Sequence, residues 1–374
     1  MSSRIKRCGA TIAIFIIAEL YQIALHYQGK CVYSYVYQRY NSTMTLRDIV
    51  HKNYGISISK LTRLTGGFRN CCYKVISNDG KYYVLIVYKR EKGVLKQIQN
   101  AHNVAMYLDQ CGFSVRVPIG SVMVKYRGKY IGLYNFIEGN TVPWEAYTKR
   151  HLKSIGKTLS DLHFHLGKYS DVNTLERLPK WADITKQEIK EMKAYFSRVE
   201  PWIERKLRIG LPWIEIDKLL SDVLVISVES STLAGRDLSV LHYDFVRGNV
   251  LYSKKLNRKL DIYPIVGIID FEKVCYGPIL ADIARTLAFL IIDCKYKGEK
   301  EVSRRFLISG YNKRGKNELE LNRDSIKKID KLLGFFWLRD FWKFLENNPY
   351  EYLHMNEHYI LTRDKLISLG VLTH

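Results

Sequence analysis

The sequence lacks the spacings by which cysteines build zinc sites or disulfide frameworks. Its seven cysteines are an odd number, and no two of them are spaced as Cys-x-x-Cys. This argues against a zinc finger and against a small domain stapled by disulfides. A reducing compartment is the simplest environment for such thiols, and we expect a cytoplasmic protein.

A long hydrophobic run is also missing near the N-terminus. The apolar run Cys8–Ala18 spans 11 residues before Glu19, whereas a membrane span needs about 20. Basic residues precede it as in a signal peptide, but no small-x-small cleavage site follows. Residues 1–44 are therefore an N-terminal extension of uncertain status. They could be a targeting segment with membrane contact through residues 1–30, a helix packed on the body, or an upstream piece not made in the cell.

Acidic residues are few relative to basic ones. Asp plus Glu number 37 and Lys plus Arg number 59, which gives a net charge of +22. The excess favours an anionic partner such as a nucleotide, nucleic acid or acidic membrane, or reflects only a lysine-rich surface. The densest basic cluster, 254–259, has no zinc-finger or RNA-binding signature beside it. We therefore expect no specific nucleic-acid partner, and the sequence does not predict an oligomeric state.

Internal repeats and low-complexity linkers are absent too, and the chain divides by composition into two halves. With 374 residues and 47% hydrophobic content, it can bury a substantial core. The first half is rich in aromatic and β-branched runs, with an Asn-Asp-Gly turn signal at 78–80. It predicts a small sheet with one helix: strands at 71–77, 81–89 and 129–137, and a helix at about 93–111.

The second half is mainly helical by its periodicity. Leu152, Ile155, Leu159, Leu162 and Leu166 recur at spacings of three and four residues, which places them on one helix face. Further predicted helices are 185–207, interrupted by Pro201, then 279–292 and 325–346. A buried strand is predicted at 265–272.

Polar residues lie between and after the apolar strands of this half. His242, Asp244 and Asn249 lie between two strand-like runs, and Asp270 follows the next strand. Phosphoryl transfer needs a carboxylate to orient or deprotonate the acceptor hydroxyl, and oxygen ligands for magnesium on the phosphates. Taken alone, the stretch 240–252 is also compatible with a polar turn that joins two strands.

Five segments in this order resemble the aminoglycoside phosphotransferase and choline kinase-like family, which has the protein-kinase-like fold. They are LTGGFRNCCYKV (64–75), GLYNFIEG (132–139), IGKTLSDLH (155–163), LHYDFVRGNVLY (241–252) and VGIIDFEKVCYGPILADIA (266–284). The resemblance implies an α+β, two-lobed fold. Its N-lobe, 45–138, would hold a small antiparallel sheet and one helix, and its helical C-lobe, 139–374, the catalytic loop and the acceptor site.

The resemblance also implies site residues for ATP and Mg²⁺. Asp244 would be the catalytic base or the carboxylate that orients the acceptor. Asn249 and Asp270 would bind magnesium, and Glu272 would add a water-mediated contact or be a surface carboxylate. His242 and Asp282 would brace the catalytic loop. Expected nucleotide contacts come from the glycine-containing hairpin and the hinge: Gly66, Gly67, Asn135, Phe136 and Ile137.

One position departs from the family pattern. Ile86 stands where the family has a lysine that grips the α- and β-phosphates, and the glutamate partner of that lysine is missing as well. Lys74 on the preceding strand could substitute, as could Arg69 in the loop before it or a bulged Lys89.

The sequence therefore predicts an enzyme, with two alternatives left open. The first interpretation is an ATP- and Mg²⁺-dependent phosphotransferase that moves the γ-phosphate to a hydroxyl of a small molecule. The alternatives are a nucleotide-binding pseudokinase or binding module, favoured by Ile86, and a kinase of a protein or surface polymer. The acceptor is not identified, although a +22 chain mildly disfavours a cationic one.

Overall fold

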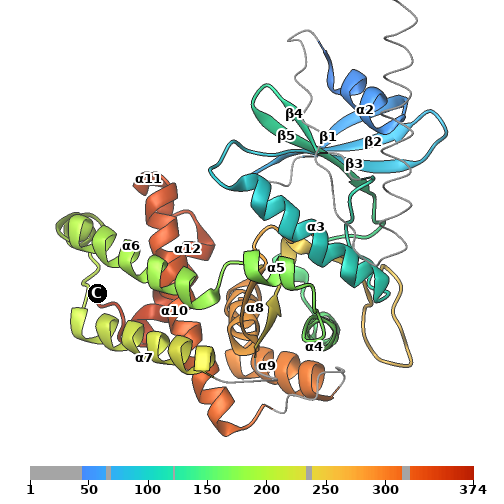
Figure 1. The fold of residues 1–374 in the computed structure, drawn as a ribbon. Helices are drawn as coiled ribbons and strands as arrows, with labels where there is room; N and C mark the ends of the chain where they lie inside the picture. Colours follow the sequence, from blue (N-terminus) through green and yellow to red (C-terminus); the bar gives the residue numbers. More distant parts are fainter. Residues whose placement is uncertain (1–43, 65–68, 121–122, 233–237, 314–320) are drawn as a thin grey trace, which may run out of the picture. The chain divides into compact units, whose positions relative to one another are not determined.

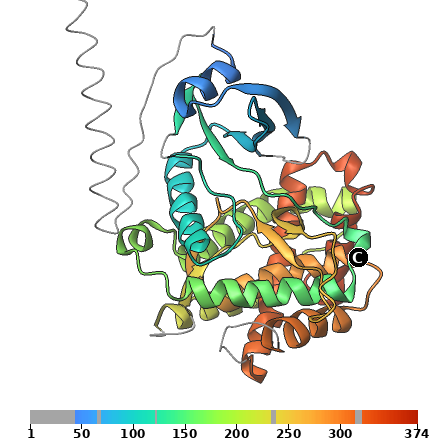
Figure 2. The ribbon, with the colours of Figure 1, turned by 90° about the vertical axis from the view of Figure 1, so that its right-hand side faces the viewer.

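The computed structural model describes residues 44–64, 69–120, 123–232, 238–313 and 321–374. The chain forms two compact units, whose elements are labelled or coloured in Figures 1 and 2. Unit 1 takes the residues up to Glu91 together with Pro118–Asn135, and unit 2 takes Lys92–Val117 and Phe136–His374. Most of the predicted N-terminal extension lies outside the described residues.

Unit 1 is built on a five-stranded antiparallel sheet of order β1-β2-β3-β5-β4. The predicted turn joins β2 to β3, and Gly80 in it has φ +80°. Glycine reaches such a φ without steric cost, so this residue sets the hairpin. The three predicted strands are confirmed with small changes of length. The strands are β1 (Ile58–Leu64), β2 (Cys71–Ser77), β3 (Tyr82–Val87), β4 (Val124–Tyr126) and β5 (Lys129–Asn135).

Helix α2 (Leu46–Tyr54) supplies the second layer of unit 1. Its Ile49 and Val50 form one core with Leu85 of β3 and other sheet residues. Side chains alternate along a strand, so Ile86 points to the face opposite this core. Ile86 pairs with Cys72 and Gly132 and is only 7% exposed. The position of the expected lysine is thus apolar and buried.

Unit 2 is mainly helical, and the predicted helices are confirmed to within a few residues at most ends. The helix predicted at 185–207 is split after Pro201, where α6 ends and a π-helical segment begins. The long helices are α3 (Val94–Gln110), α4 (Lys149–Leu166), α6 (Trp181–Trp202), α7 (Trp213–Thr232), α8 (Ile279–Asp293), α10 (Arg323–Asn347) and α12 (Glu357–Ser368). The shorter ones are η1 (Trp144–Ala146), α5 (Val172–Arg177), η2 (Ile203–Leu207), η3 (Arg247–Asn249), α9 (Glu299–Ser303), η4 (Arg304–Asn312) and α11 (Tyr350–Leu353).

Two small antiparallel ladders lie within unit 2. β6 (Leu238–Leu241) pairs with β9 (Cys275–Pro278), and β7 (Val250–Tyr252) pairs with β8 (Ile265–Ile268). The segment 242–249 therefore leaves one ladder and enters the other. Both of its ends are held by strand pairing, which limits how far the residues between them can move.

Helix α3 packs into the core of unit 2. Its Ala101, Val104 and Leu108 belong to the same buried cluster as the helices that follow in the chain. Asn103 also donates to the hydroxyl of Thr174 on α5 at 2.8 Å. The predicted N-lobe, 45–138, included this helix together with the sheet. Sequence order alone does not show which core the apolar face of a helix joins.

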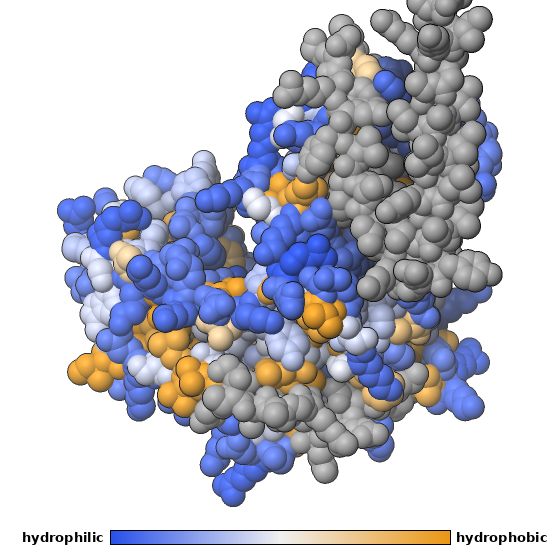
Figure 3. Space-filling model, viewed as in Figure 1, coloured by the Kyte–Doolittle hydropathy of each residue, from blue (hydrophilic) through white to orange (hydrophobic). Residues whose placement is uncertain are grey.

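The surface is largely polar on the face seen in Figure 3, where apolar side chains occur in small separate groups. Among the described residues, no helix is both long enough and apolar enough to cross a membrane.

Helices α4 and η4 cross at a very close approach, and Figure 2 shows α4 (green) along its length. A Cβ placed on Gly156 of α4 would lie 2.2 Å from the carbonyl oxygen of Phe306 and 2.8 Å from the backbone nitrogen of Tyr311. These are backbone atoms, so no side chain can move aside. Only glycine at 156 allows this packing, which also brings Tyr311 toward α4.

We expect Gly156→Ala to destabilise unit 2 by about 3 kcal/mol, because overpacking forces the backbone apart. The measurement is urea unfolding followed by tryptophan fluorescence. Gly298→Ala is the matched control, since a Cβ at Gly298 meets nothing within 4 Å and its φ is −63°. Equal midpoints for the two variants would contradict the packing argument.

Candidate active site

The loop 242–249 is held by a buried carboxylate from the next helix. Asp282 of α8 accepts the backbone N–H groups of His242 and Tyr243, each at 3.0 Å. His163 of α4 contacts Asp282 Oδ2 at 3.2 Å through Nε2 and the hydroxyl of Tyr311 at 2.8 Å through Nδ1. The prediction that Asp282 holds the loop backbone from the following helix is confirmed.

His242 braces the loop from inside. Its Nδ1 accepts the N–H of Asp244 at 3.3 Å, as predicted for a structural histidine. The imidazole is fully buried, and burial lowers the pKa of His242 because it disfavours the charged form. His242 is therefore neutral at physiological pH. It accepts the N–H of Asp244 and so orients the backbone of that residue.

Asp244 has both carboxylate oxygens engaged. Oδ2 accepts from Asn249 Nδ2 at 3.1 Å, and Oδ1 accepts from Lys273 Nζ at 3.0 Å. Burial by itself would raise the pKa of Asp244, but the positive charges of Lys273 and Arg285 and the hydrogen bond from Lys273 outweigh it and lower the pKa. The carboxyl group is thus ionised at neutral pH and ready to accept a hydrogen bond from a hydroxyl.

The residues predicted to bind magnesium come from two adjoining segments. Asn249 also donates from Nδ2 to the carbonyl of Asp244 at 2.9 Å, which leaves its amide oxygen as the atom that could coordinate a cation. The N–H of Ile269 donates to the carbonyl of Asn249 at 2.9 Å, so Asp270 is one residue from this contact. Asp270 is exposed, and Glu272 is half-buried on the turn that follows.

This donor set fits magnesium. Mg²⁺ takes one or two protein oxygens together with phosphate oxygens and water. Within the described ranges, no three His, Cys, Asp or Glu side chains gather as an all-protein metal site. One amide oxygen and one carboxylate are therefore the plausible protein ligands here. Asp270 also has φ +65°, a strained backbone conformation of a kind that is common at functional positions.

The predicted nucleotide-binding residues are distributed over both units. Gly66 and Gly67 lie outside the described residues. Asn135 ends β5 in unit 1, while Phe136 begins the second segment of unit 2. Ile137 packs against Gly267 of β8, where an added Cβ would lie 2.6 Å from its side chain.

The basic residues proposed to replace the missing lysine are engaged within unit 1. Arg69 pairs with Glu91, and Lys89 lies 3.7 Å from the same carboxylate. The ammonium of Lys74 lies 4.5 Å from the ring centre of Tyr82.

Lys273 is the site residue that sequence reasoning missed. It lies three residues after Asp270 and makes the ion pair with Asp244 described above. The sequence does show a basic residue close to the predicted metal ligand Asp270. It does not show that this residue pairs with Asp244, which lies 29 residues away in the chain. Arg247 of the loop lies 3.7 Å from Asp293.

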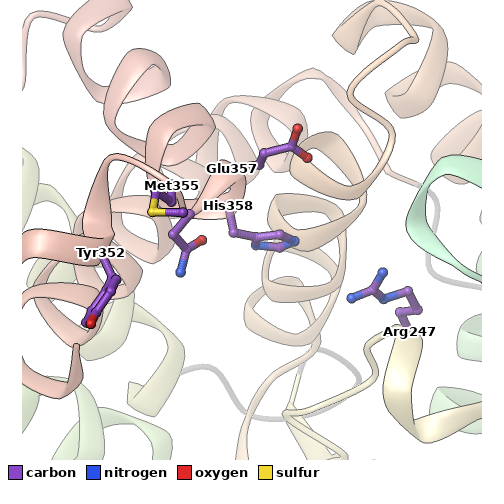
Figure 4. Close-up of a pocket in the computed structure, with 6 residues that line it drawn as sticks. Arg247, Tyr352, Met355, Glu357 and His358 are labelled. Atoms are coloured by element: carbon purple, nitrogen blue, oxygen red, sulfur yellow. The ribbon is translucent and has the colours of Figure 1, made fainter. Parts of the chain in front are cut away.

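A cavity of about 550 Å³ opens beside the loop. Figure 4 shows Arg247 on one side and the residues around α11 and the start of α12 on the other, with Arg247 and His358 pointing toward one another. His358 Nε2 lies 2.8 Å from Asp293, so both side chains contact the same carboxylate. The lining residues are Arg247, Tyr352, Met355, Asn356, Glu357 and His358.

The fold and the loop together define a phosphotransferase with the protein-kinase-like fold. Residues 60–295 match the sequence profile of the Phosphotransferase enzyme family. The match spans more than half of the 374 residues, and the chain belongs to this family. The predicted family and the predicted enzyme class, a small-molecule phosphotransferase with an alcohol group as acceptor, are confirmed. No curated protein sequence matches the chain.

Several solved structures share the fold. An amicoumacin kinase in complex with AMP-PNP, Ca²⁺ and Ami is 16% identical, with 87% of this chain and 94% of that chain covered and a TM-score of 0.60. An aminoglycoside 2'-phosphotransferase-IIIa in complex with GDP is 14% identical, with 85% and 96% covered and a TM-score of 0.58. A macrolide 2'-phosphotransferase from Brachybacterium faecium is 13% identical, with 86% and 97% covered and a TM-score of 0.52. The predicted two-lobed α+β fold class is confirmed.

Removing the Asp282 carboxylate should leave the N–H groups of His242 and Tyr243 without their acceptor and so destabilise the loop. We expect Asp282→Ala to destabilise the protein by about 2–5 kcal/mol, because two buried N–H groups lose their acceptor at roughly 1–3 kcal/mol each. Chemical denaturation measures the change. Asp217→Ala is the control, since Asp217 forms an exposed pair with Lys193 and such pairs contribute about 0–1 kcal/mol. A loss no larger than that of the control would show that the loop does not depend on Asp282.

Proposed function

We propose that this chain transfers the γ-phosphate of ATP, with Mg²⁺, to a hydroxyl group of a small molecule. The observation that carries the proposal is the pair Asp244 and Asn249 on a braced loop, with Asp270 following Ile269, whose N–H bonds to Asn249. A carboxylate, an amide oxygen and a second carboxylate in adjoining segments are the groups that phosphoryl transfer requires from a protein.

Asp244 acts on the acceptor in this proposal. An ionised carboxylate with a lowered pKa is a weak base, so its first role is to accept the hydrogen bond of the acceptor hydroxyl and to aim its oxygen. The proton leaves the hydroxyl as the bond to phosphorus forms, and Asp244 receives it at that stage. Asn249 keeps the carboxylate in one orientation through the 3.1 Å contact.

Asn249 and Asp270 would hold Mg²⁺, and Glu272 would add a contact through water. Bound magnesium supplies positive charge to the phosphate oxygens and orients them for displacement. Lys74 with Gly66, Gly67 and the segment Asn135–Ile137 would contact the nucleotide. In support, related structures carry AMP-PNP in the amicoumacin kinase and ADP in a spectinomycin phosphotransferase.

The acceptor would bind at the cavity beside Arg247. Three observations support this place: Arg247 is three residues from Asp244, the cavity volume suits a small molecule, and its walls combine Tyr352 and Met355 with charged side chains. The structurally similar proteins include an amicoumacin kinase, a spectinomycin phosphotransferase and a macrolide 2'-phosphotransferase, which makes hydroxyl-bearing natural products the first acceptors to test.

One observation favours a second candidate, a nucleotide-binding protein with little transferase activity. Ile86 fills a lysine position with a buried apolar side chain. Loss of one charge-assisted contact to phosphate weakens binding by roughly 1.5–3 kcal/mol, which slows a kinase without abolishing it. Turnover of ATP in the presence of an acceptor distinguishes the two functions. A cytoplasmic location stays a prediction in either case.

Asp244→Ala should reduce phosphate transfer by ~10²–10⁴-fold, the usual effect of losing a positioned base. ATP consumption is measured against a library of hydroxyl-bearing acceptors, with circular dichroism to verify folding. Asp217→Ala serves as the control in the same unit. Unchanged turnover of the Asp244 variant at saturating ATP and acceptor would refute the assignment.

Asp270 should matter more than Glu272 for magnesium-dependent nucleotide binding. We expect Asp270→Asn to weaken AMP-PNP binding in the presence of Mg²⁺ by roughly tenfold or more, equivalent to ~1.4 kcal/mol. Glu272→Gln should change it by about twofold or less, because a contact through water is weaker. Calorimetry with and without Mg²⁺ measures both. Equal affinities of wild type and Asp270→Asn would remove Asp270 from the metal site.

A further inference from the structure

Lys273 presents its ammonium group next to the proposed catalytic carboxylate. Its Nζ lies 3.0 Å from Asp244 Oδ1, while its side chain is 42% exposed. An ammonium group has three donor protons. One is used by Asp244, and the exposure leaves room for other acceptors at the same nitrogen.

The backbone that carries Lys273 is well fixed. It belongs to a tight turn in which the N–H of Val274 donates to the carbonyl of Phe271 at 3.2 Å. Phe271 and Val274 are both 3% exposed, so buried side chains anchor the turn on either side of Lys273. The same turn follows directly from Asp270. The Lys273 ammonium therefore contacts the predicted acceptor-orienting carboxylate from the same segment that carries the predicted metal ligand.

Two arginines, Arg247 on the loop and Arg285 on α8, contact carboxylates other than Asp244. Arg247 contacts the buried Asp293, and Arg285 donates to Asp340 at 2.9 Å. In unit 1 the lysine position on β3 is the buried Ile86. Transferring a phosphoryl group spreads negative charge over its three oxygens, and enzymes place cations or metal there. Lys273 has the charge, the exposure and the position for this role.

We propose that Lys273 is a catalytic residue that donates a hydrogen bond to the γ-phosphoryl group while it holds Asp244, and so supplies charge that Ile86 cannot. The inference rests on the proposed function. In the step it serves, the acceptor oxygen bonds to the γ-phosphorus as the bond to the β–γ bridging oxygen breaks. The electron pair leaves with that oxygen on ADP, and the acceptor proton passes to Asp244. Lys273 stays protonated throughout.

The test compares nucleotides with and without a γ-phosphate. In Lys273→Met, the affinity for AMP-PNP with Mg²⁺ should fall about tenfold or more, because a charge-assisted hydrogen bond is lost. The affinity for ADP with Mg²⁺ should change by about twofold or less, since ADP lacks the group that Lys273 contacts. Calorimetry reads both values without any turnover, and kcat with a working acceptor should fall by roughly ten- to a hundredfold.

Lys273→Met also leaves the Asp244 charge without its partner, which could destabilise the protein or repel phosphate. The comparison is therefore repeated in Asp244→Asn, where that charge is absent. A selective loss of AMP-PNP binding in Asp244→Asn/Lys273→Met relative to Asp244→Asn alone supports direct contact. Equal loss of both nucleotides, or no loss, overturns it and reduces Lys273 to a partner of Asp244.

Lys193→Met is the matched control, because Lys193 pairs with Asp217 at 2.7 Å and is 45% exposed, close to the value for Lys273. It should bind both nucleotides as wild type does. Lys74→Met is tested in parallel, and a loss selective for AMP-PNP there but not in Lys273→Met assigns the contact to unit 1 and overturns the proposal. If wild type binds neither nucleotide with Mg²⁺, the proposed function fails and the role of Lys273 fails with it.

Discussion

The carboxylate of Asp282 accepts two consecutive backbone N–H groups, those of His242 and Tyr243, in a site closed to solvent. An isolated buried charge would be very unfavourable, and these donors together with His163 make it tolerable. The same residues tie four segments together: α8 through Asp282, α4 through His163, η4 through Tyr311, and the loop itself. The close crossing at Gly156 is what brings α4 and η4 near enough for this network. The geometry of the candidate site thus depends on a charge that never meets the substrate.

Two residues in and after the loop have strained backbone conformations. Tyr243 has φ +57° and Asp270 has φ +65°, both unusual for residues with side chains. Such conformations persist only where the surroundings hold them. Tyr243 is held by Asp282 through its N–H, and Asp270 follows Ile269, whose N–H is bonded to Asn249. Hydrogen bonds at or next to both strained residues therefore hold the chain in these conformations.

The placement of positive charge distinguishes this chain from its family pattern. The family's strand lysine is replaced by the buried Ile86, and α3, the helix after that strand, has no glutamate to pair with such a lysine. A lysine added there without a carboxylate would be an unpaired buried charge, so losing both together is physically consistent. In unit 2, by contrast, Lys273 lies beside Asp244 and remains partly exposed. Positive charge at the site is therefore supplied from the segment that also carries the predicted metal ligand.

The sequence determined the parts of this protein that depend on local pattern and spacing. Aromatic and β-branched runs indicated the strands around Ile86, helical periodicity indicated α4, and the order of motifs indicated the fold and the contact of Asp282 with the loop. The roles of Asp244 and Asn249 stay predictions. Three features came only from the tertiary structure. Helix α3 joins the core of unit 2, the Lys273–Asp244 pair spans 29 residues, and the cavity unites Arg247 with side chains more than a hundred residues later. These features depend on which distant side chains meet once the cores pack, and neither propensity nor periodicity along the chain carries that information.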